Sequence, residues 1–283
     1  MDRDLPPPWV RAHAAACADG AFKYRDPATG YEVFTELGLR RRGSCCGCGC
    51  RHCPFGHDEV PAEQRAARIR RAAWLRGPRP EGCDHAVVFH SGGKDSYLAL
   101  RAVQRRHPEW RPVLLTTFDA ETRVVAHQEI PIARVVSQAA ALDLPLMGVP
   151  LVRGADYATS VGEGLLRMAR HATIRTLVFG DLHLRHIRDW RERSLGPIAA
   201  QLGATLYFPL WSQPYGRLLD ELEQGGVEVR VSAAPEPRLI EPLRVGDLFN
   251  RRAMDSLASE VDGFGESGEF HTEVVAASLA PAS

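Results

Sequence analysis

Short apolar runs and amphipathic segments alternate from about residue 85 to about residue 232. Apolar runs bounded by turn residues are typical of buried strands, whereas apolar positions three or four residues apart indicate helices. The strands predicted in this way are residues 85–90, 112–118, 146–151, 175–180, 205–208 and 227–232. The helices predicted between them are residues 95–107, 127–142, 157–172, 189–202 and 216–225. This order predicts an α/β protein with a mostly parallel sheet and helices on both faces.

The pattern is different at both ends of the chain. The first 60 residues are rich in proline, glycine and cysteine and have little apolar periodicity. Residues 61–77 carry Ile69, Ala73 and Trp74 at helical spacing, which predicts a helix, and another helix is predicted at 250–259. Four segments are predicted. They are a cysteine-rich segment (residues 1–60), a helix with a linker (61–82), an α/β domain (83–210) and a small C-terminal subdomain (211–283).

A glycine-rich loop, Ser91-Gly92-Gly93-Lys94-Asp95-Ser96, joins the first of these strands to the helix after it. Backbone N–H groups and the helix dipole favour an anion at such a turn. Lys94 adds a compact positive charge, and it is one of only two lysines in a chain with 35 lysines and arginines. The spacing is not that of a Walker A loop. The loop therefore predicts a phosphate site of another kind.

Polar residues also end two other predicted strands. Thr117 lies near the end of one strand, and Gly180 and Asp181 lie at the end of another, with Arg188 a few residues later. Because ligands of parallel sheets bind outside the carboxyl ends of the strands, we expect these residues to share one crevice with the glycine-rich loop. Asp95 and Asp181 would there be placed to hold Mg²⁺ against phosphates, since carboxylates are among its usual ligands.

Four stretches spread over roughly residues 85–275 together resemble one known family. They are Ser91–Ser96; Ala126-His127 with Gln138–Leu146; Val178–Asp181 with Arg188–Glu192 and Phe208–Trp211; and Gly265–Thr272. In this order and spacing they resemble the diphthine–ammonia ligase family of PP-loop ATP pyrophosphatases. The first stretch alone occurs in many PP-loop enzymes, so the set of four is much more specific.

The resemblance implies a Rossmann-like (HUP-type) fold and cleavage of ATP to AMP and pyrophosphate. A substrate carbonyl or carboxylate oxygen is adenylated, and ammonia or an amine then displaces AMP. Adenylation gives a poor acyl donor a good leaving group, while positive charge and backbone dipoles stabilise the developing phosphoryl charge. The residues implied for catalysis are Lys94, Asp95, Asp181, Glu266 and Glu269. Those implied for binding ATP are Ser91, Gly92, Gly93, Lys94, Asp95, Ser96, Thr117 and Gly180.

Glu266 and Glu269 lie on a glycine-rich turn, where composition alone would favour a solvated acidic loop. The family match places them on the acceptor side, as groups that orient an amine or act as bases. His127 and His271 are weaker candidates, and Phe264 stands where the family often has cysteine. The arginine-rich, lysine-poor composition suggests a bacterium, whereas the diphthamide target exists only in archaea and eukaryotes. The acceptor is therefore left open as a small molecule or a protein-borne group.

Five of the seven cysteines fall within nine positions, at Cys45, Cys46, Cys48, Cys50 and Cys53. Such clustering favours metal or redox chemistry in a reducing compartment over a secreted disulfide scaffold. The segment resembles a small uncharacterised cysteine-rich module whose core is Cys45, Cys46, Cys50 and Cys53. We predict that these four bind a metal in a lobe of their own.

The spacing leaves the kind of metal open. Cys46-x3-Cys50-x2-Cys53 places three thiolates on a tight loop, which suits an iron–sulfur cluster with one open iron. Four thiolates, or three with His52 or His57, suit tetrahedral Zn²⁺ equally well. Zinc is slightly favoured because two adjacent cysteines rarely bind the same ion, and thiols without a ligand are the remaining interpretation.

The overall charge and hydropathy narrow the class of protein. The net charge is zero and the pI is about 7.2, so the chain lacks the basic excess of many nucleic-acid-binding proteins, and nucleic acid is not the favoured partner. No apolar run approaches the ~20 residues of a membrane span, and the N-terminus lacks a signal-peptide core. We therefore expect a cytoplasmic protein. Two alternative functions are a tRNA sulfur-inserting PP-loop enzyme with an N-terminal iron–sulfur cluster, and a non-catalytic module that senses adenine nucleotides.

Overall fold

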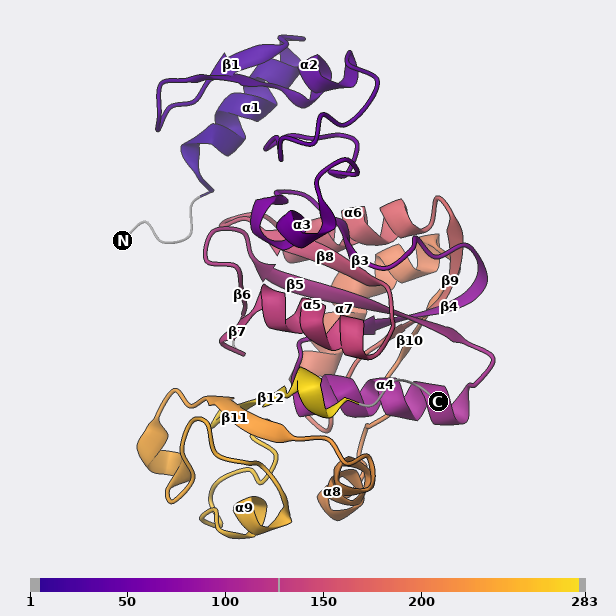
Figure 1. Cartoon of the computed structure of the whole chain (residues 1–283), viewed down its shortest axis with the longest axis vertical. Helices are drawn as coiled ribbons and strands as arrows, with labels where there is room; N and C mark the ends of the chain where they lie inside the picture. Colours follow the sequence, from indigo (N-terminus) through magenta and orange to yellow (C-terminus); the bar gives the residue numbers. More distant parts are fainter. Residues whose placement is uncertain (1–5, 127, 280–283) are drawn as a thin grey trace.

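The computed structural model describes residues 6–126 and 128–279, and its centre is a mostly parallel sheet (Figure 1). The parallel strands are β4 (Gly82–Phe89), β5 (Arg111–Asp119), β8 (Leu146–Leu151), β9 (Ala172–Val178) and β10 (Thr205–Tyr207). An edge strand, β3 (Ala73–Arg76), runs antiparallel to β8. Within the described residues these six strands are ordered β10–β9–β4–β5–β8–β3.

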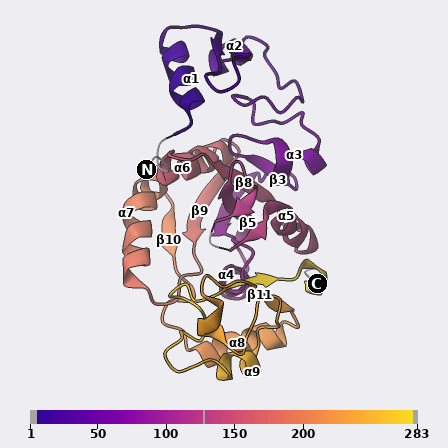
Figure 2. The ribbon, with the colours of Figure 1, turned by 90° about the vertical axis from the view of Figure 1, so that its left-hand side faces the viewer.

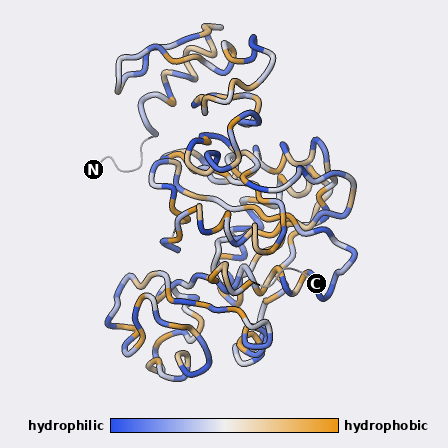
Figure 3. Tube along the Cα trace, in the orientation of Figure 1, coloured by the Kyte–Doolittle hydropathy of each residue, from blue (hydrophilic) through white to orange (hydrophobic). Residues whose placement is uncertain are grey.

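Helices cover both faces of this sheet (Figure 2). They are α4 (Lys94–Arg106), α5 (Ile132–Ala141), α6 (Tyr157–Met168) and α7 (Arg185–Gln201). Helices α4 and α5 pack with Ala86 and Val88 of β4, whereas α6 and α7 pack on the opposite face with Val87. Successive side chains of a strand point to opposite faces, so each central strand supplies two cores. Apolar segments accordingly gather around the sheet in Figure 3.

The predicted Rossmann-like α/β fold is confirmed by this arrangement. A short antiparallel pair, β6 (Val124–Val125) and β7 (Ile130–Pro131), lies between β5 and α5. Across the described parts of the chain, no helix is both long enough and apolar enough to cross a bilayer.

The helix predicted for residues 61–77 is wrong in its second half. Helix α3 (Ala62–Arg68) is followed by β3, which joins the central sheet. Ala73 is buried in the core under α4 and α5, while its neighbour Trp74 is buried in the core on the other face. The apolar residues of this segment therefore follow a period of two, and such a short run fits either pattern when read from sequence alone.

The chain after the central sheet folds back to the glycine-rich loop. Its elements are α8 (Tyr215–Gln224), β11 (Val229–Ala233), η1 (Pro237–Ile240), α9 (Arg251–Asp255), β12 (His271–Val274) and η2 (Ala276–Ser278). The strand predicted at 227–232 is β11, but it pairs antiparallel with β12 and not with the central sheet. The backbone N–H of Val274 donates to the carbonyl of Gly92 at 2.9 Å, and β12 lies beside α4 in Figure 1.

Residues 6–60 form a small module at the β3–β8 edge of the sheet (Figure 1). Its elements are α1 (Pro8–Ala18), β1 (Lys23–Arg25), β2 (Glu32–Phe34) and α2 (Glu36–Arg40). Arg51 donates to the buried carboxylate of Asp26 at 2.7 Å, and Tyr24 and His52 share a hydrogen bond of 2.9 Å. These bonds tie the cysteine-bearing loop to the β1–β2 hairpin.

Replacing Gly180 by alanine should destabilise the protein by about 1–3 kcal/mol, because the added carbon overpacks a tight contact. A Cβ at Gly180 would lie 2.7 Å from the carbonyl oxygen of Asp95, where the end of β9 meets the first turn of α4. Gly196 in α7 is the matched control, since a Cβ there meets nothing within 4 Å. Urea unfolding should show a lower midpoint only for Gly180→Ala, and equal midpoints would contradict the close contact.

Candidate functional site

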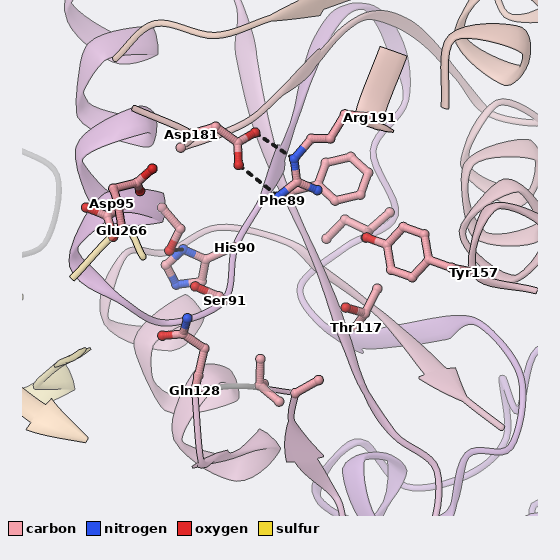
Figure 4. Close-up of a pocket in the computed structure, with 15 residues that line it drawn as sticks. Phe89, His90, Ser91, Asp95, Thr117, Gln128, Tyr157, Asp181, Arg191 and Glu266 are labelled. Atoms are coloured by element: carbon pink, nitrogen blue, oxygen red, sulfur yellow. Dashed lines mark hydrogen bonds and ion pairs between the residues drawn. The ribbon is translucent and has the colours of Figure 1, made fainter. Parts of the chain in front are cut away.

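The loops that follow β4 and β9 part from one another near the middle of the sheet. Strands β4 and β9 are neighbours in the sheet. After β4 the chain continues to β5 and β8 on one side of this pair, and after β9 it continues to β10 on the other side. Ligands of open α/β sheets bind at such a switch point, outside the carboxyl ends of the strands. A cavity of about 280 Å³ lies at this place (Figure 4).

The cavity brings together many of the residues predicted from the sequence. Those in its wall are Ser91, Asp95, Ser96, Thr117, Gly180, Asp181 and Glu266. As far as the structure describes the chain, Gly92, Gly93, Lys94 and Glu269 are not in the wall. His127 lies outside the described residues. Polar wall residues for which no role was predicted are His90, Gln128, Tyr157 and Arg191, although Arg191 lies within a stretch that resembles the family.

The glycine-rich loop takes a shape that glycine makes accessible. Gly92 has φ +89°, a conformation that other residues rarely adopt. Gly93 then caps the N-terminus of α4, and the Ser96 hydroxyl donates to the Gly93 carbonyl at 2.9 Å. The loop thus delivers Ser91 and the first turn of α4 to the cavity, where the helix dipole favours an anion.

A buried glutamine of α5 fixes this loop. The side-chain amide of Gln138 donates to the carbonyls of Gly92 at 3.0 Å and Val274 at 2.6 Å. Its oxygen must then accept, so His90 Nε2, at 2.9 Å, carries the proton of that bond. Burial lowers the pKa of His90 to about 4, which keeps its ring neutral near pH 7. Gln138 lies within a stretch that resembles the family, but no residue pattern indicated this role.

Three carboxylates from separate segments face the cavity (Figure 4): Asp95 in the first turn of α4, Asp181 after β9, and Glu266 in the C-terminal part. Desolvation and the nearby charge of Asp95, with a smaller effect of Asp181, raise the pKa of Glu266 to about 7. Burial also raises the pKa of Asp95, against the attraction of the Lys94 ammonium. Within the described residues, the buried Oδ1 atom of Asp95 has no hydrogen-bond partner.

Arg191 of α7, and not Arg188, reaches the cavity. Its guanidinium makes two bonds to Asp181, at 2.6 Å and 3.1 Å, and lies 4.7 Å from the centre of the Phe179 ring. The guanidinium of Arg188 instead lies 4.8 Å from the centre of the Phe208 ring, and Arg188 is not part of the described cavity wall. The expectation for Arg188 is therefore corrected: α7 already begins at Arg185, and residues three apart on a helix differ by nearly a full turn along its axis.

Glu266 and Glu269 have different surroundings. The Asp262 carboxylate accepts the N–H groups of Phe264 at 2.9 Å and Glu266 at 3.1 Å, which shapes the turn that carries Glu266 into the cavity. Glu269 accepts the N–H of Asp262 at 3.1 Å through Oε1, and its Oε2 is buried without a partner among the described residues. Glu269 thus orders the turn from outside the cavity wall.

The clustered cysteines form two close pairs. Cys46 Sγ lies 3.3 Å from Cys50 Sγ, and Cys53 Sγ lies 3.8 Å from Cys45 Sγ. A hydrogen bond from the Cys48 N–H, followed by the Cys50 thiol, lowers the pKa of Cys46 to about 7. Burial raises the pKa of Cys50 to about 12. Of the Cys46–Cys50 pair, the exposed Cys46 is therefore the residue that more readily forms a thiolate.

Neither candidate histidine joins these thiols. The His52 ring stacks on His13 at 3.6 Å between ring centres and bonds to Tyr24, while His57 Nε2 bonds to the Cys50 carbonyl at 3.0 Å. In the described residues, no group of three or more His, Cys, Asp or Glu side chains is arranged to hold a metal ion. The metal site therefore remains a prediction from the sequence.

Comparison with known proteins found a family match in the N-terminal module and a weak similarity to a solved structure. Residues 12–59 match a family of unknown function, DUF5522. The chain is similar to a solved structure described as a predicted subunit of tRNA methyltransferase from Methanocaldococcus jannaschii. That similarity covers 55% of this chain and 80% of the other, with 17% identity and a TM-score of 0.31, which is too low to carry an argument about function.

Proposed function

We propose that the protein is an ATP-dependent, AMP-forming ligase that adenylates a carbonyl or carboxylate oxygen and transfers ammonia or an amine to it. The observation that supports this most directly is the cavity at the switch point. There a glycine-rich loop and the start of α4 meet carboxylates from three segments of the chain, Asp95, Asp181 and Glu266. The resemblance of the sequence to the diphthine–ammonia ligase family agrees with this proposal.

The cavity wall contains groups that suit the two parts of ATP. Ser91 and the N-terminal turn of α4 offer the dipole and N–H groups that bind a pyrophosphate. Phe89, Leu115 and Val125 contribute apolar surface on which a base can lie. Thr117 and Gly180 lie in the same wall, so the nucleotide would extend across the ends of β4, β5 and β9.

The carboxylates also fit a divalent cation. Asp95 Oδ1 is a buried acceptor without a partner among the described residues, and Asp181 lines the same cavity. Oxygen ligands of this kind, supplemented by substrate phosphates, are those that Mg²⁺ prefers. When bound, the ion would neutralise phosphate charge and orient the α-phosphate. Asp95 and Asp181 would hold it, while Arg191 fixes the position of the Asp181 carboxylate through two hydrogen bonds.

Glu266 is suited to proton transfer at neutral pH, because a carboxyl with a pKa of about 7 exists in both forms there. In its ionised form it would accept a proton from ammonium, which frees ammonia to attack the adenylated carbon, or from an amine as it attacks, and AMP leaves. The alternative of sulfur insertion into tRNA requires a sulfur donor at the cavity. The clustered cysteines lie in the N-terminal module, and the described cavity wall contains no cysteine. We therefore favour transfer of nitrogen.

The test is to incubate the protein with [α-³²P]ATP, Mg²⁺, ammonium and a panel of carboxylic acids, and to separate the labelled products. Labelled AMP, with pyrophosphate formed in equal amount, is the expected result. Labelled ADP would contradict cleavage between the α- and β-phosphates. ATP that binds stoichiometrically but is left intact with every acceptor, with and without RNA, would favour the nucleotide-sensing alternative.

We further propose that Cys45, Cys46, Cys50 and Cys53 bind zinc or an iron–sulfur cluster. Protein purified without oxygen should carry about one metal site per chain, and Cys50→Ser should lose it because a thiolate ligand is removed. Cys17→Ser is the matched control, since Cys17 lies in α1 outside the cluster. Elemental analysis with an optical spectrum gives the metal and its amount. Metal-free protein with freely titratable thiols in the cluster would contradict the proposal.

A further inference from the structure

The ammonium of Lys94 is buried beside the cavity that its loop helps to form, but it is not part of the described cavity wall. Lys94 is only 2% exposed. Its Nζ donates to the carbonyl of Phe264 at 2.6 Å and to Asp95 Oδ2 at 2.9 Å. A buried ammonium is costly unless it is paired and hydrogen-bonded, and here both acceptors are supplied by the protein.

Three aromatic rings surround the same ammonium. Its Nζ lies 4.8 Å from the ring centre of Phe264, 5.5 Å from Phe249 and 5.8 Å from Phe270. All three rings are buried, and all come from the C-terminal part of the chain. A cation over aromatic faces is attracted to them, the more so when water is excluded. The cage therefore holds Lys94 by interactions that a phosphate would have to displace.

The backbone of the glycine-rich loop is bound to the same C-terminal segment. The N–H of Lys94 donates to the Thr272 hydroxyl at 3.2 Å, and the carbonyl of Gly92 accepts the N–H of Val274 at 2.9 Å. Gln138 bridges Gly92 and Val274 from α5. The loop that binds phosphate in our proposal and the segment that carries Glu266 thus form one hydrogen-bonded unit, with Lys94 at its centre.

We infer that Lys94 is a positioning residue, which fastens residues 264–274 to the glycine-rich loop and so sets Glu266 opposite Asp95, and that it does not bind the phosphates of the nucleotide. The placement of Lys94 stands on the contacts alone, whereas its consequence for transfer rests on the proposed function. Within the described cavity wall, phosphate charge would then be met by Arg191 and by a divalent ion held there.

The chain offers a direct test, because Lys23 and Lys94 are its only lysines. Lys23 lies on the surface, with its side chain 46% exposed, whereas that of Lys94 is 3% exposed. The folded protein is treated with an amine-acetylating reagent and the labelled peptides are quantified by mass spectrometry over time. Protein unfolded in guanidinium chloride gives the unprotected rate of each lysine.

We expect Lys94 to react about 100-fold or more slowly than Lys23, because its reaction requires local opening of the C-terminal segment. This protection should be the same with and without MgATP. A Lys94 that reacts readily in the free protein and becomes protected by MgATP would overturn the inference, because that is the behaviour of a phosphate ligand. The readout needs no turnover, so it stands even where the proposed reaction is not found.

A variant of Lys94 further distinguishes a positioning role from a role in binding phosphate. In Lys94→Met, amide hydrogen exchange in residues 262–274 should be about tenfold faster or more, while the Kd for MgATP changes less than about threefold. Lys23→Met is the matched control and should change neither quantity. A large loss of ATP affinity with unchanged exchange would overturn the inference. If Lys94→Met does not fold, the acetylation rates of the unmodified protein still decide between the two roles.

The pH profile adds a measurement that a purely structural contact would not affect. Glu266 is faced by the negative charges of Asp95 and Asp181, by the Tyr215 hydroxyl, and by the positive charge of Lys94. Removal of that positive charge should move the midpoint of the pH–rate profile for transfer upwards in Lys94→Met. An unchanged midpoint, with slower transfer, would mean that Lys94 has no electrostatic effect on Glu266.

Discussion

Replacement of Asp95 by asparagine is expected to lower the rate of pyrophosphate release by about two to three orders of magnitude, the usual cost of removing one group that stabilises charge in a transition state. Asp95 Oδ1 is buried without a partner among the described residues and faces the cavity beside Asp181. Asparagine keeps the shape of the side chain and an oxygen for Lys94, so the lost property is the negative charge that would hold Mg²⁺.

The measurement is single-turnover release of pyrophosphate at saturating MgATP, with an acceptor identified by the product assay. Asp189→Asn is the matched control, because Asp189 is an exposed residue of α7 away from the cavity wall. Its rate should stay within about twofold of the unmodified protein. An Asp95→Asn variant that is folded and releases pyrophosphate at the original rate would remove Asp95 from the proposed site.

Replacement of Glu266 by glutamine is expected to reduce transfer to the acceptor by about 10²–10⁴-fold, the range for loss of a general base, with ATP affinity nearly unchanged. In the unmodified protein, transfer should rise with pH and reach half of its maximum near the Glu266 pKa of about 7. The direction follows from the raised pKa: below it Glu266 is protonated and cannot accept a proton, and above it the carboxylate is available. Glu266→Gln should lose this rise.

Glu269→Gln is the matched comparison for this variant. The sequence placed both glutamates on the acceptor side, but Glu269 lies outside the described cavity wall and accepts the Asp262 N–H through Oε1. Glutamine keeps that acceptor, so transfer should fall only a few-fold and the pH rise should persist. Equal losses in the two variants would mean that both carboxylates act on the acceptor. Loss of ATP binding in folded Glu266→Gln would instead place Glu266 on the nucleotide side.

Much of the sheet could be predicted because its central strands are apolar in sequence and buried in the structure. Strand β8 and the second half of β4 are buried on both faces, so their sequences are nearly continuous apolar runs. The segment before β4 could not be assigned in the same way. Residues 73–76 form an edge strand because β8 offers a free edge to pair with, and that edge is supplied by residues 70 or more positions away.

The sequence by itself determined which chemistry the candidate site can contain. The glycine-rich turn before α4, the polar ends of β5 and β9, and the two glutamates of the C-terminal turn are local features, and local features follow from nearby residues. It also identified the clustered cysteines, whose role neither the contacts of the module nor its match to DUF5522 defines.

Only the tertiary structure decided the direction in which each of these side chains points. Helix α7 begins early enough to bring Arg191 to Asp181 and to turn Arg188 towards Phe208. The C-terminal segment buries Lys94 among three phenylalanines, and it separates Glu266 from Glu269. The physical reason is common to these cases: the partners that fix a charged side chain lie far away in the sequence, and only the folded chain brings them within hydrogen-bond distance.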